Sequence, residues 1–267
     1  MSGARRTRVR LAQNLFASPS AAQALVAAAE LAPGDRVYDL GAGTGAVTAA
    51  LLSAGVRVIA VERDANLARK LRARFDGRPV AVLEADLRDV VFRAPFKVVA
   101  NPPFNLTADL LRRLLADSPA PLSAALVLQR EAAEKYAGAR LTAVSLQARP
   151  WFALDLGRSF SRRDFVPAPN VDVALLRIAR QAAPDVAAAD AGAWRGFIRY
   201  ALARPRPDAR RTFRGLVSNL QWRRLSQALA IAPDALRAEL TYEQWLGVFR
   251  FVQRCAPATK GRRLAGD

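Results

Sequence analysis

The feature that most constrains the fold is a glycine-rich turn between an apolar run and a helix-forming run. The stretch VYDLGAGTGAV carries Gly41, Gly43 and Gly45 directly after the apolar residues 36–40. Glycine lets the backbone turn tightly and lets a ligand approach closely, as in nucleotide-binding strand–turn–helix units. Glu62, twenty-one residues beyond Gly41, is placed to accept hydrogen bonds from ribose hydroxyls. The same spacing fits a dinucleotide fingerprint, so the turn alone leaves NAD open as the ligand.

Short apolar runs alternate along the chain with Ala-, Leu- and Arg-rich segments of helical length. These runs span residues 36–40, 57–62, 79–86, 97–102 and 122–129. Because they are apolar at nearly every position, they predict a parallel sheet covered by helices on both faces. Two later runs, 151–157 and 171–178, flank a turn-rich stretch and predict an antiparallel edge to that sheet.

The pattern from residue 194 to 253 is helical only. Its first segment has Trp194, Phe197, Ile198 and Ala201 at helical spacing, and RRTFRGLVSNL (210–220) is also predicted helical. We therefore expect an α/β fold, a Rossmann-like sheet with a small all-helical C-terminal domain. The expected ranges are a basic leader at 1–17, the sheet domain at 18–180, the helical domain at 181–255 and a basic tail at 256–267. The low-complexity stretch APDVAAADAG (183–192) is expected to be a linker.

Charge and composition narrow the function further. The net charge of +18 and the pI near 11.5 favour a polyanionic partner, above all nucleic acid, although a solvated cationic surface is the alternative. The chain has no histidine, which excludes imidazole bases, nucleophiles and metal ligands, and Cys255 is its single cysteine, which excludes an internal disulfide and a cysteine zinc cluster. No apolar run reaches the ~18 residues of a membrane span. We expect a cytoplasmic monomer with no metal.

A second motif, NPPF, ends the fourth apolar run. Its prolines fix the backbone and remove amide donors, so Asn101 and the Pro102 region offer rigid acceptors at the ligand-binding edge of the sheet. Two acceptors suit the two hydrogens of an exocyclic amine, whose lone pair they can turn toward an electrophilic methyl group. Phe104 could stack on the base, which is worth roughly 1–3 kcal/mol. The alternative is a Pro-Pro turn with Phe104 in the core.

A third acidic residue, Asp86, lies near the end of the third run, in LEADL. On the same rim of the sheet, its carboxylate could accept a hydrogen bond from the amino group of an adenine ring. It could also cap a helix that begins near Leu87. The sequence leaves both roles open.

With these motifs the chain resembles the Erm/KsgA family of S-adenosylmethionine-dependent rRNA adenine N6-methyltransferases, and the Erm branch more closely. The resemblance covers nearly the whole chain and rests on LAQNLFASP (11–19), DLGAGTGAVT (39–48), AVERD (60–64), EADLRD (84–89), NPPFNLT (101–107), FVPAPNVDVALLRI (165–178) and RRTFRGLVSNL. NPPF alone is moderately specific, since other amino-methyltransferases use similar tetrapeptides. The Gln13-Asn14 and Phe165-Val166-Pro167 elements select the rRNA family.

The resemblance implies a class I methyltransferase sheet, S-adenosylmethionine as cofactor and a role for each matching residue. Gln13, Asn14 and the glycine turn would lie at the methionine end of the cofactor, Glu62 at its ribose and Asp86 at its adenine. Asn101 and Pro102 would hold the target amine, Phe104 would stack on the flipped base, and Phe165 would approach that base from the other side. Two departures from the family pattern are the inserted Leu15 before Phe16 and the Pro103-Phe104 pair where the family often has other residues.

The resemblance also implies the substrate, an adenine in domain V of protein-free or precursor 23S rRNA. Methylation there would confer macrolide, lincosamide and streptogramin B resistance. The residues expected to contact RNA phosphates are Arg5, Arg6, Arg8, Arg10, Arg162, Arg163, Arg204, Arg206, Arg210, Arg211 and Arg214. The alternatives are a KsgA-like 16S rRNA dimethyltransferase and a non-catalytic nucleic-acid-binding relative.

Overall fold

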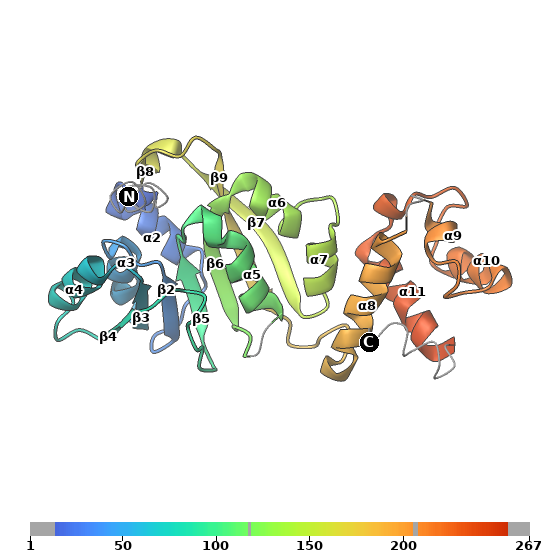
Figure 1. Ribbon diagram of the computed structural model, residues 1–267, viewed down its shortest axis with the longest axis horizontal. Coiled ribbons are helices and arrows are strands. Elements are labelled where there is room, and N and C mark those ends of the chain that lie inside the picture. The colour runs from blue at the N-terminus through green and yellow to red at the C-terminus, as the bar shows by residue number, and fades with distance from the viewer. Residues whose placement is uncertain (1–13, 117–118, 205–207, 256–267) are drawn as a thin grey trace, which may run out of the picture. The chain divides into compact units, whose positions relative to one another are not determined.

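The computed structural model describes residues 14–116, 119–204 and 208–255 (Figure 1). The chain divides into two compact units. The sheet unit consists of the chain up to Gly138 together with Phe152–Arg180, and the helical unit consists of Ala139–Trp151 together with the chain from Gln181 onward. Each unit has its own hydrophobic core.

A mixed sheet forms the centre of the sheet unit, with seven strands among the described residues. In spatial order these are β4 (Val80–Glu84), β3 (Arg57–Glu62), β2 (Arg36–Leu40), β5 (Lys97–Ala100), β6 (Ser123–Gln129), β9 (Val173–Arg180) and β7 (Phe152–Phe160). The first five are parallel to one another, whereas β9 is antiparallel to both β6 and β7. The predicted antiparallel edge is therefore confirmed.

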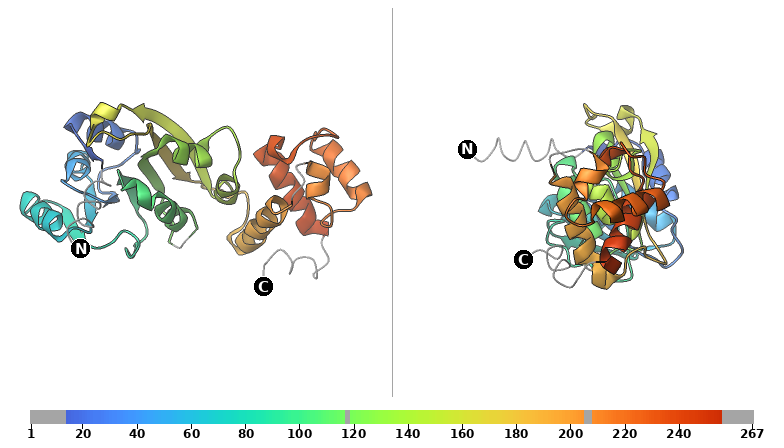
Figure 2. Two further views of the ribbon diagram at one scale, coloured as in Figure 1. Left: turned by 45° about the horizontal axis from the view of Figure 1, so that its top comes forward. Right: turned by 90° about the vertical axis from the view of Figure 1, so that its right-hand side faces the viewer.

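Helices cover both faces of this sheet. They are α2 (Pro19–Ala27), α3 (Ala46–Ser53), α4 (Ala65–Arg74), α5 (Thr107–Ala116) and α6 (Arg130–Ala137). Leu25 of α2, Leu51 of α3 and Leu71 of α4 pack in one core cluster with alternate strand residues such as Val99. Figures 1 and 2 show α5 on the other face of the sheet. Burial on both faces explains why the strands read as continuous apolar runs.

The order of the strands reverses between β2 and β5. From β2 the chain proceeds outward to β3 and β4, then returns to β5 on the other side of β2. Parallel pairing joins Val37 to Lys97 and Tyr38 to Val98. In open α/β sheets the crevice outside the carboxyl ends of the strands at such a switch point is the usual ligand site. The glycine turn follows β2 and Asn101 follows β5, so both motifs flank this position.

The helical unit contains α7 (Ala143–Ala148), α8 (Ala191–Leu202), α9 (Ala209–Thr212), α10 (Asn219–Ala228) and α11 (Tyr242–Cys255). The last four are drawn in orange and red in Figure 1. The predicted apolar stripe of α8 is buried, since Trp194, Phe197, Ile198 and Ala201 are all 0% exposed. None of the helices in the described ranges is long and apolar enough to cross a membrane.

Three details of the helical unit differ from expectation. Residues 139–151 belong with it rather than with the sheet, because Leu146 packs in its core and accepts the indole hydrogen bond of Trp194 (2.9 Å). The stretch RRTFRGLVSNL is not one helix: α9 ends at Thr212 and Ser218 caps α10. The expected linker is packed, since Val186 is 4% exposed and Asp185 accepts a hydrogen bond from Tyr242 (2.9 Å).

Candidate cofactor and base site

The glycine turn after β2 has a backbone that only glycine adopts readily. Gly41, Gly43 and Gly45 have φ angles of +81°, +57° and +85°. A Cβ added to Gly45 would also lie 2.7 Å from the side chain of Leu71 and 2.8 Å from that of Phe75, which hold α4 against α3. Each of the three positions therefore requires glycine for its backbone conformation, and glycine at position 45 also permits close packing.

Glu62, at the end of β3, is hydrogen-bonded to the backbone of this turn. Its carboxylate is buried and accepts hydrogen bonds from the backbone N–H of Gly43 (2.9 Å) and of Asp64 (2.8 Å). Each carboxylate oxygen can accept a second hydrogen bond, so both oxygens keep capacity for hydroxyl groups. The ribose role of Glu62 stays a prediction, and the structure adds a second role in fixing the loop.

Asp39, near the end of β2 and two residues before Gly41, is a buried acidic residue that the sequence analysis does not single out. It is 0% exposed, and its Oδ2 accepts a hydrogen bond from the Thr48 hydroxyl (2.6 Å). Its Oδ1 has no hydrogen-bond partner among the described residues. Burial, reinforced by the nearby Glu62 charge, raises the pKa of Asp39 to about 7. An acidic residue inside an otherwise apolar strand was the signal that could have identified it.

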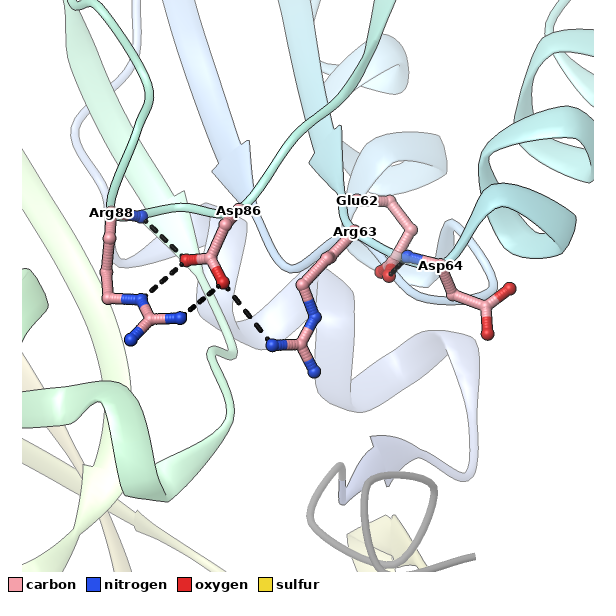
Figure 3. Close-up of polar contacts among 5 residues, drawn as sticks. All are labelled: Glu62, Arg63, Asp64, Asp86 and Arg88. Carbon is pink, nitrogen blue, oxygen red and sulfur yellow. Dashed lines mark hydrogen bonds and ion pairs between the residues drawn. The ribbon is translucent and has the colours of Figure 1, made fainter. Parts of the chain in front are cut away.

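Asp86 lies just beyond the end of β4, and two arginines approach its carboxylate from two sides (Figure 3). Its Oδ1 accepts hydrogen bonds from the backbone N–H (3.0 Å) and Nε (2.9 Å) of Arg88. Its Oδ2 accepts from an Arg88 guanidinium nitrogen (2.8 Å) and from Arg63 (3.3 Å). The Arg88 hydrogen bond is the main reason that the pKa of Asp86 is lowered. In this structure Asp86 caps a turn, while its adenine role stays a prediction.

Asn101 follows β5, and its side-chain amide nitrogen has a hydrogen-bond partner whereas its side-chain oxygen has none among the described residues. Its side-chain amide donates to the backbone carbonyl of Asn14 (2.7 Å). Its Oδ1 is buried and has no hydrogen-bond partner within the described residues. A buried acceptor without a donor is costly, roughly 1–3 kcal/mol, and such atoms are uncommon away from functional sites. This arrangement fits the predicted role of Asn101 as an acceptor for an incoming amine.

The aromatic residues of the site differ in exposure. Phe104 begins a short 3₁₀ helix, η1 (Phe104–Leu106), and is partly buried against the core that α2, α3 and α4 cover. Phe165 is 2% exposed, with its ring stacked on Phe16 at a centroid distance of 5.2 Å. Phe104 is thus the more accessible ring, and the stacking roles of both residues stay predictions.

Two distant motifs meet in a small antiparallel ribbon. β1 (Leu15–Phe16) pairs with β8 (Phe165–Val166), which joins the N-terminal element to the Phe-Val-Pro element. The inserted leucine has a definite place, because a Cβ added to Gly43 would lie 2.5 Å from Leu15 Cδ2. The ribbon therefore brings Asn14 to Asn101 and Leu15 to the glycine turn. Gln13, the other predicted residue of this element, lies outside the described residues.

The expected RNA-contacting arginines are placed as follows. Arg5, Arg6, Arg8, Arg10 and Arg206 lie outside the described residues. Arg162, Arg163, Arg204, Arg210, Arg211 and Arg214 are all exposed. Arg162 pairs with Asp172 (2.9 Å), Arg211 with Asp208 (3.6 Å), and Arg204 lies over the ring of Tyr200 (4.2 Å). These exposed arginines are accessible to RNA phosphates, and their contacts with RNA stay predictions.

The donor and acceptor set fits an adenosyl cofactor. The turn at Gly41, Gly43 and Gly45 presents backbone, Glu62 is a buried carboxylate beside it, and Asp39 has an unpaired buried oxygen. Among the residues described, no group of three or more acidic or cysteine side chains is arranged to hold a metal ion. Two of the buried polar atoms without a hydrogen-bond partner among the described residues, Asp39 Oδ1 and Asn101 Oδ1, belong to residues near the ends of β2 and β5.

Comparisons with known proteins show the family of the chain. The model of the family "Ribosomal RNA adenine dimethylase" matches residues 4–254. An rRNA adenine N-6-methyltransferase of Bacillus licheniformis is 27% identical over 89% of this chain and 84% of its own. A ribosomal RNA small subunit methyltransferase A of Synechococcus elongatus is 30% identical over 90% of this chain and 93% of its own.

Two solved structures have the same fold. The 23S rRNA methyltransferase ErmE superimposes with a TM-score of 0.82 at 24% identity, covering 90% of this chain and 100% of that one. A dimethyladenosine transferase from Plasmodium falciparum superimposes with a TM-score of 0.71 at 19% identity, covering 90% and 98%. The predicted α/β methyltransferase fold is confirmed.

Proposed function

Because the chain belongs to the ribosomal RNA adenine dimethylase family, whose methyl donor is S-adenosylmethionine, we propose that its substrate is an adenine in domain V of 23S rRNA. The product would be N6-methyladenine or N6-dimethyladenine, and the consequence would be resistance to macrolide, lincosamide and streptogramin B antibiotics. The chain is an rRNA adenine N6-methyltransferase, and the choice of 23S rRNA is the proposal.

The observation that carries the chemistry is the unpaired Oδ1 of Asn101. The Asn101 amide is held at its other end by the Asn14 carbonyl, and Pro102 and Pro103 follow it directly. A fixed acceptor for one amine hydrogen costs no reorganisation at the moment of reaction, which is the general advantage of a preorganised site. With a backbone carbonyl as second acceptor, the amine nitrogen would present its lone pair out of the ring plane.

The residues of the site can then carry out methyl transfer without a histidine. The bound cofactor supplies an electrophilic methyl group. Glu62 and the glycine turn orient it, Asn101 holds the target amine, and Phe104 stacks against the base once it has left its helix. Since the attacking lone pair is freed by hydrogen bonding rather than by a strong base, the amine keeps both protons until its bond to the methyl carbon has formed, and one proton then passes to water. Exposed arginines of both units would hold the RNA backbone.

Support for 23S rather than 16S rRNA comes from two sources. ErmE, named for 23S rRNA, matches along its full length with the higher of the two TM-scores given above. The NPPF sequence itself, with Pro103 and Phe104, resembles the Erm branch. The second candidate, 16S rRNA dimethylation, is favoured by the identity to the small subunit methyltransferase of Synechococcus, which exceeds that to the Bacillus enzyme.

The two candidates are separated by offering the enzyme both substrates. Purified protein is incubated with labelled S-adenosylmethionine and an equimolar mixture of protein-free 23S and 16S rRNA, and methyl incorporation into each is counted. The proposal expects at least tenfold more label in 23S rRNA. Label confined to 16S rRNA would establish the second candidate, and the Asn101→Ala variant is the negative control for either.

A further inference from the structure

The hydrogen bonds around Asp86 leave no vacant acceptor position for an adenine. A carboxylate offers about four lone-pair sites. Within the described residues, Arg88 provides three hydrogen bonds to Asp86 and Arg63 provides the fourth. If Asp86 is to accept a hydrogen bond from the amino group of the cofactor's adenine, one of these donors has to leave.

The geometry points to which one leaves. The bonds from Arg88 are 2.8 to 3.0 Å long and come from a residue two positions away, so forming them orders little chain. Arg63 makes a single bond, 3.3 Å long; the two arginine side chains are about equally exposed, at 52% and 51%, so the length and number of the bonds distinguish them. Arg63 therefore has the weaker hold on Asp86, and its guanidinium can return to water at small cost.

The Arg63 guanidinium also occupies the position on Asp86 that the ring amine would take. Arg63 directly follows Glu62, the predicted ribose acceptor at the end of β3, and it reaches across to Asp86 beyond β4. Figure 3 shows the Arg63 guanidinium between these two acidic residues, on the side of Asp86 away from Arg88. An adenine whose ribose bonds Glu62 would bring its amine to the same Asp86 oxygen that Arg63 occupies.

We propose that Arg63 competes with the cofactor's adenine for Asp86, and that adenine binding displaces Arg63 while Arg88 stays. This rests on the proposed adenosyl cofactor and its contact with Asp86. Arg88 is then a positioning residue that keeps the carboxylate oriented toward the ring. Arg63 lowers the affinity for the cofactor, because its ion pair with Asp86 has to break first. It also discriminates between ligands, because only a ring that donates a hydrogen bond to Asp86 compensates for the lost ion pair.

Calorimetric titration with S-adenosylhomocysteine tests the competition without any methyl transfer. Arg63→Ala is expected to bind it about three- to fivefold more tightly than wild type, the scale of a partly exposed ion pair. The analogue with purine in place of adenine, which carries hydrogen where the amine stands and has no ring N–H, cannot donate to Asp86. Its dissociation constant is expected to be the same for wild type and Arg63→Ala, because it does not use the vacated position.

The control is Arg72→Ala. Arg72 makes a similar exposed ion pair with Glu84, two residues before Asp86, at the same 3.3 Å distance. The Arg72→Ala substitution removes the same charge as Arg63→Ala. If Arg72→Ala also bound S-adenosylhomocysteine more tightly, the tighter binding would be due to long-range electrostatics, and the proposal would be overturned. Weaker or unchanged binding of S-adenosylhomocysteine by Arg63→Ala, or equal tightening for both ligands, would overturn it too.

Failure of the underlying assignment has a different signature. If wild type binds neither ligand, the cofactor assignment itself fails. If wild type binds S-adenosylhomocysteine and Asp86→Ala binds it equally well, the adenine contact fails. The competition fails alone when Asp86→Ala weakens binding and Arg63→Ala does not strengthen it.

Discussion

The ends of β4 and β5 carry two hydrogen-bond acceptors in opposite states. Beyond β4, Asp86 accepts four hydrogen bonds from Arg63 and Arg88. Beyond β5, Asn101 has a buried Oδ1 that accepts none within the described residues. An ionised carboxylate would be costly to leave unpaired, whereas a neutral amide oxygen costs less. If Asn101 holds the substrate amine and Asp86 the cofactor's adenine, as we propose, the acceptor for the substrate is open before the substrate arrives, whereas the acceptor for the cofactor has to be released.

The largest effect is expected at the open acceptor. Asn101→Ala should lower kcat about 10²- to 10³-fold, the usual loss for removing one preorganised hydrogen-bonding group at a reacting centre. Binding of S-adenosylhomocysteine should stay within about twofold, because the amine acceptor is not part of the proposed ribose and adenine contacts. Asn105→Ala, an exposed asparagine four residues away, is the control. Near-normal turnover by Asn101→Ala contradicts the assignment.

The second prediction concerns the buried carboxylate between these regions. The folded-state pKa of Asp39 is raised to about 7, above its ordinary value of 3.8, so the unfolded chain releases this proton at lower pH. The stability present at acidic pH is therefore lost as pH rises from about 4 to about 7, by roughly 2–3 kcal/mol between pH 5 and 8.

Asp39→Asn should flatten that dependence. Its amide oxygen can still accept the Thr48 hydrogen bond, and it does not ionise. The free energy of unfolding, measured by urea denaturation at pH 5 and pH 8, provides the comparison. The depressed pKa of Asp86 affects stability only below this window. Equal pH slopes in wild type and Asp39→Asn would contradict the buried charge as their cause.

A smaller effect is expected at the stacking ring next to Asn101. Phe104→Ala should reduce kcat/KM about tenfold, since stacking on a base is worth roughly 1–3 kcal/mol. Phe104→Tyr keeps the ring and should retain most of the activity. If Phe104→Ala instead lowers the free energy of unfolding and leaves kcat/KM unchanged, Phe104 is a core residue, which was the alternative reading of the sequence.

The smallest effect is expected from an ion pair that contacts neither Asp86 nor Asn101. Arg72 and Glu84 are 48% and 43% exposed, so the pair is well screened by water. Arg72→Ala should change the free energy of unfolding by less than about 0.5 kcal/mol. A loss above about 1 kcal/mol would show that exposed pairs near β4 matter more than their geometry indicates, which would weaken the contrast drawn for Asp86.

The sequence predicted the sheet well because its strands are buried on both faces and end in recognisable turns. β2 and β3 have the bounds that the apolar runs predicted, and Gly41, Gly43 and Gly45 form the tight turn that the motif predicted, with positive φ angles. Both signals are local. The antiparallel edge was predictable for the same reason, from two apolar runs around one turn-rich stretch.

The contacts that tertiary packing creates could not be predicted. Arg63 reaches Asp86 across 23 residues of chain, and Leu146 accepts the Trp194 hydrogen bond across 48. Neither leaves a pattern in the sequence near the residue. The break between α9 and α10 was easier to predict from the sequence. Gly215, with φ of +98°, and the capping residue Ser218 lie inside the stretch that was predicted to be helical.

The most direct test of the central claim is to map the methylated nucleotide. Protein-free 23S rRNA is treated with wild type and with Asn101→Ala in the presence of S-adenosylmethionine, then digested and analysed by mass spectrometry. We predict N6-methylated adenine in a domain V fragment for wild type and none for the variant, which should still bind S-adenosylhomocysteine. Modification outside domain V, or the same modification with the variant, would contradict the account.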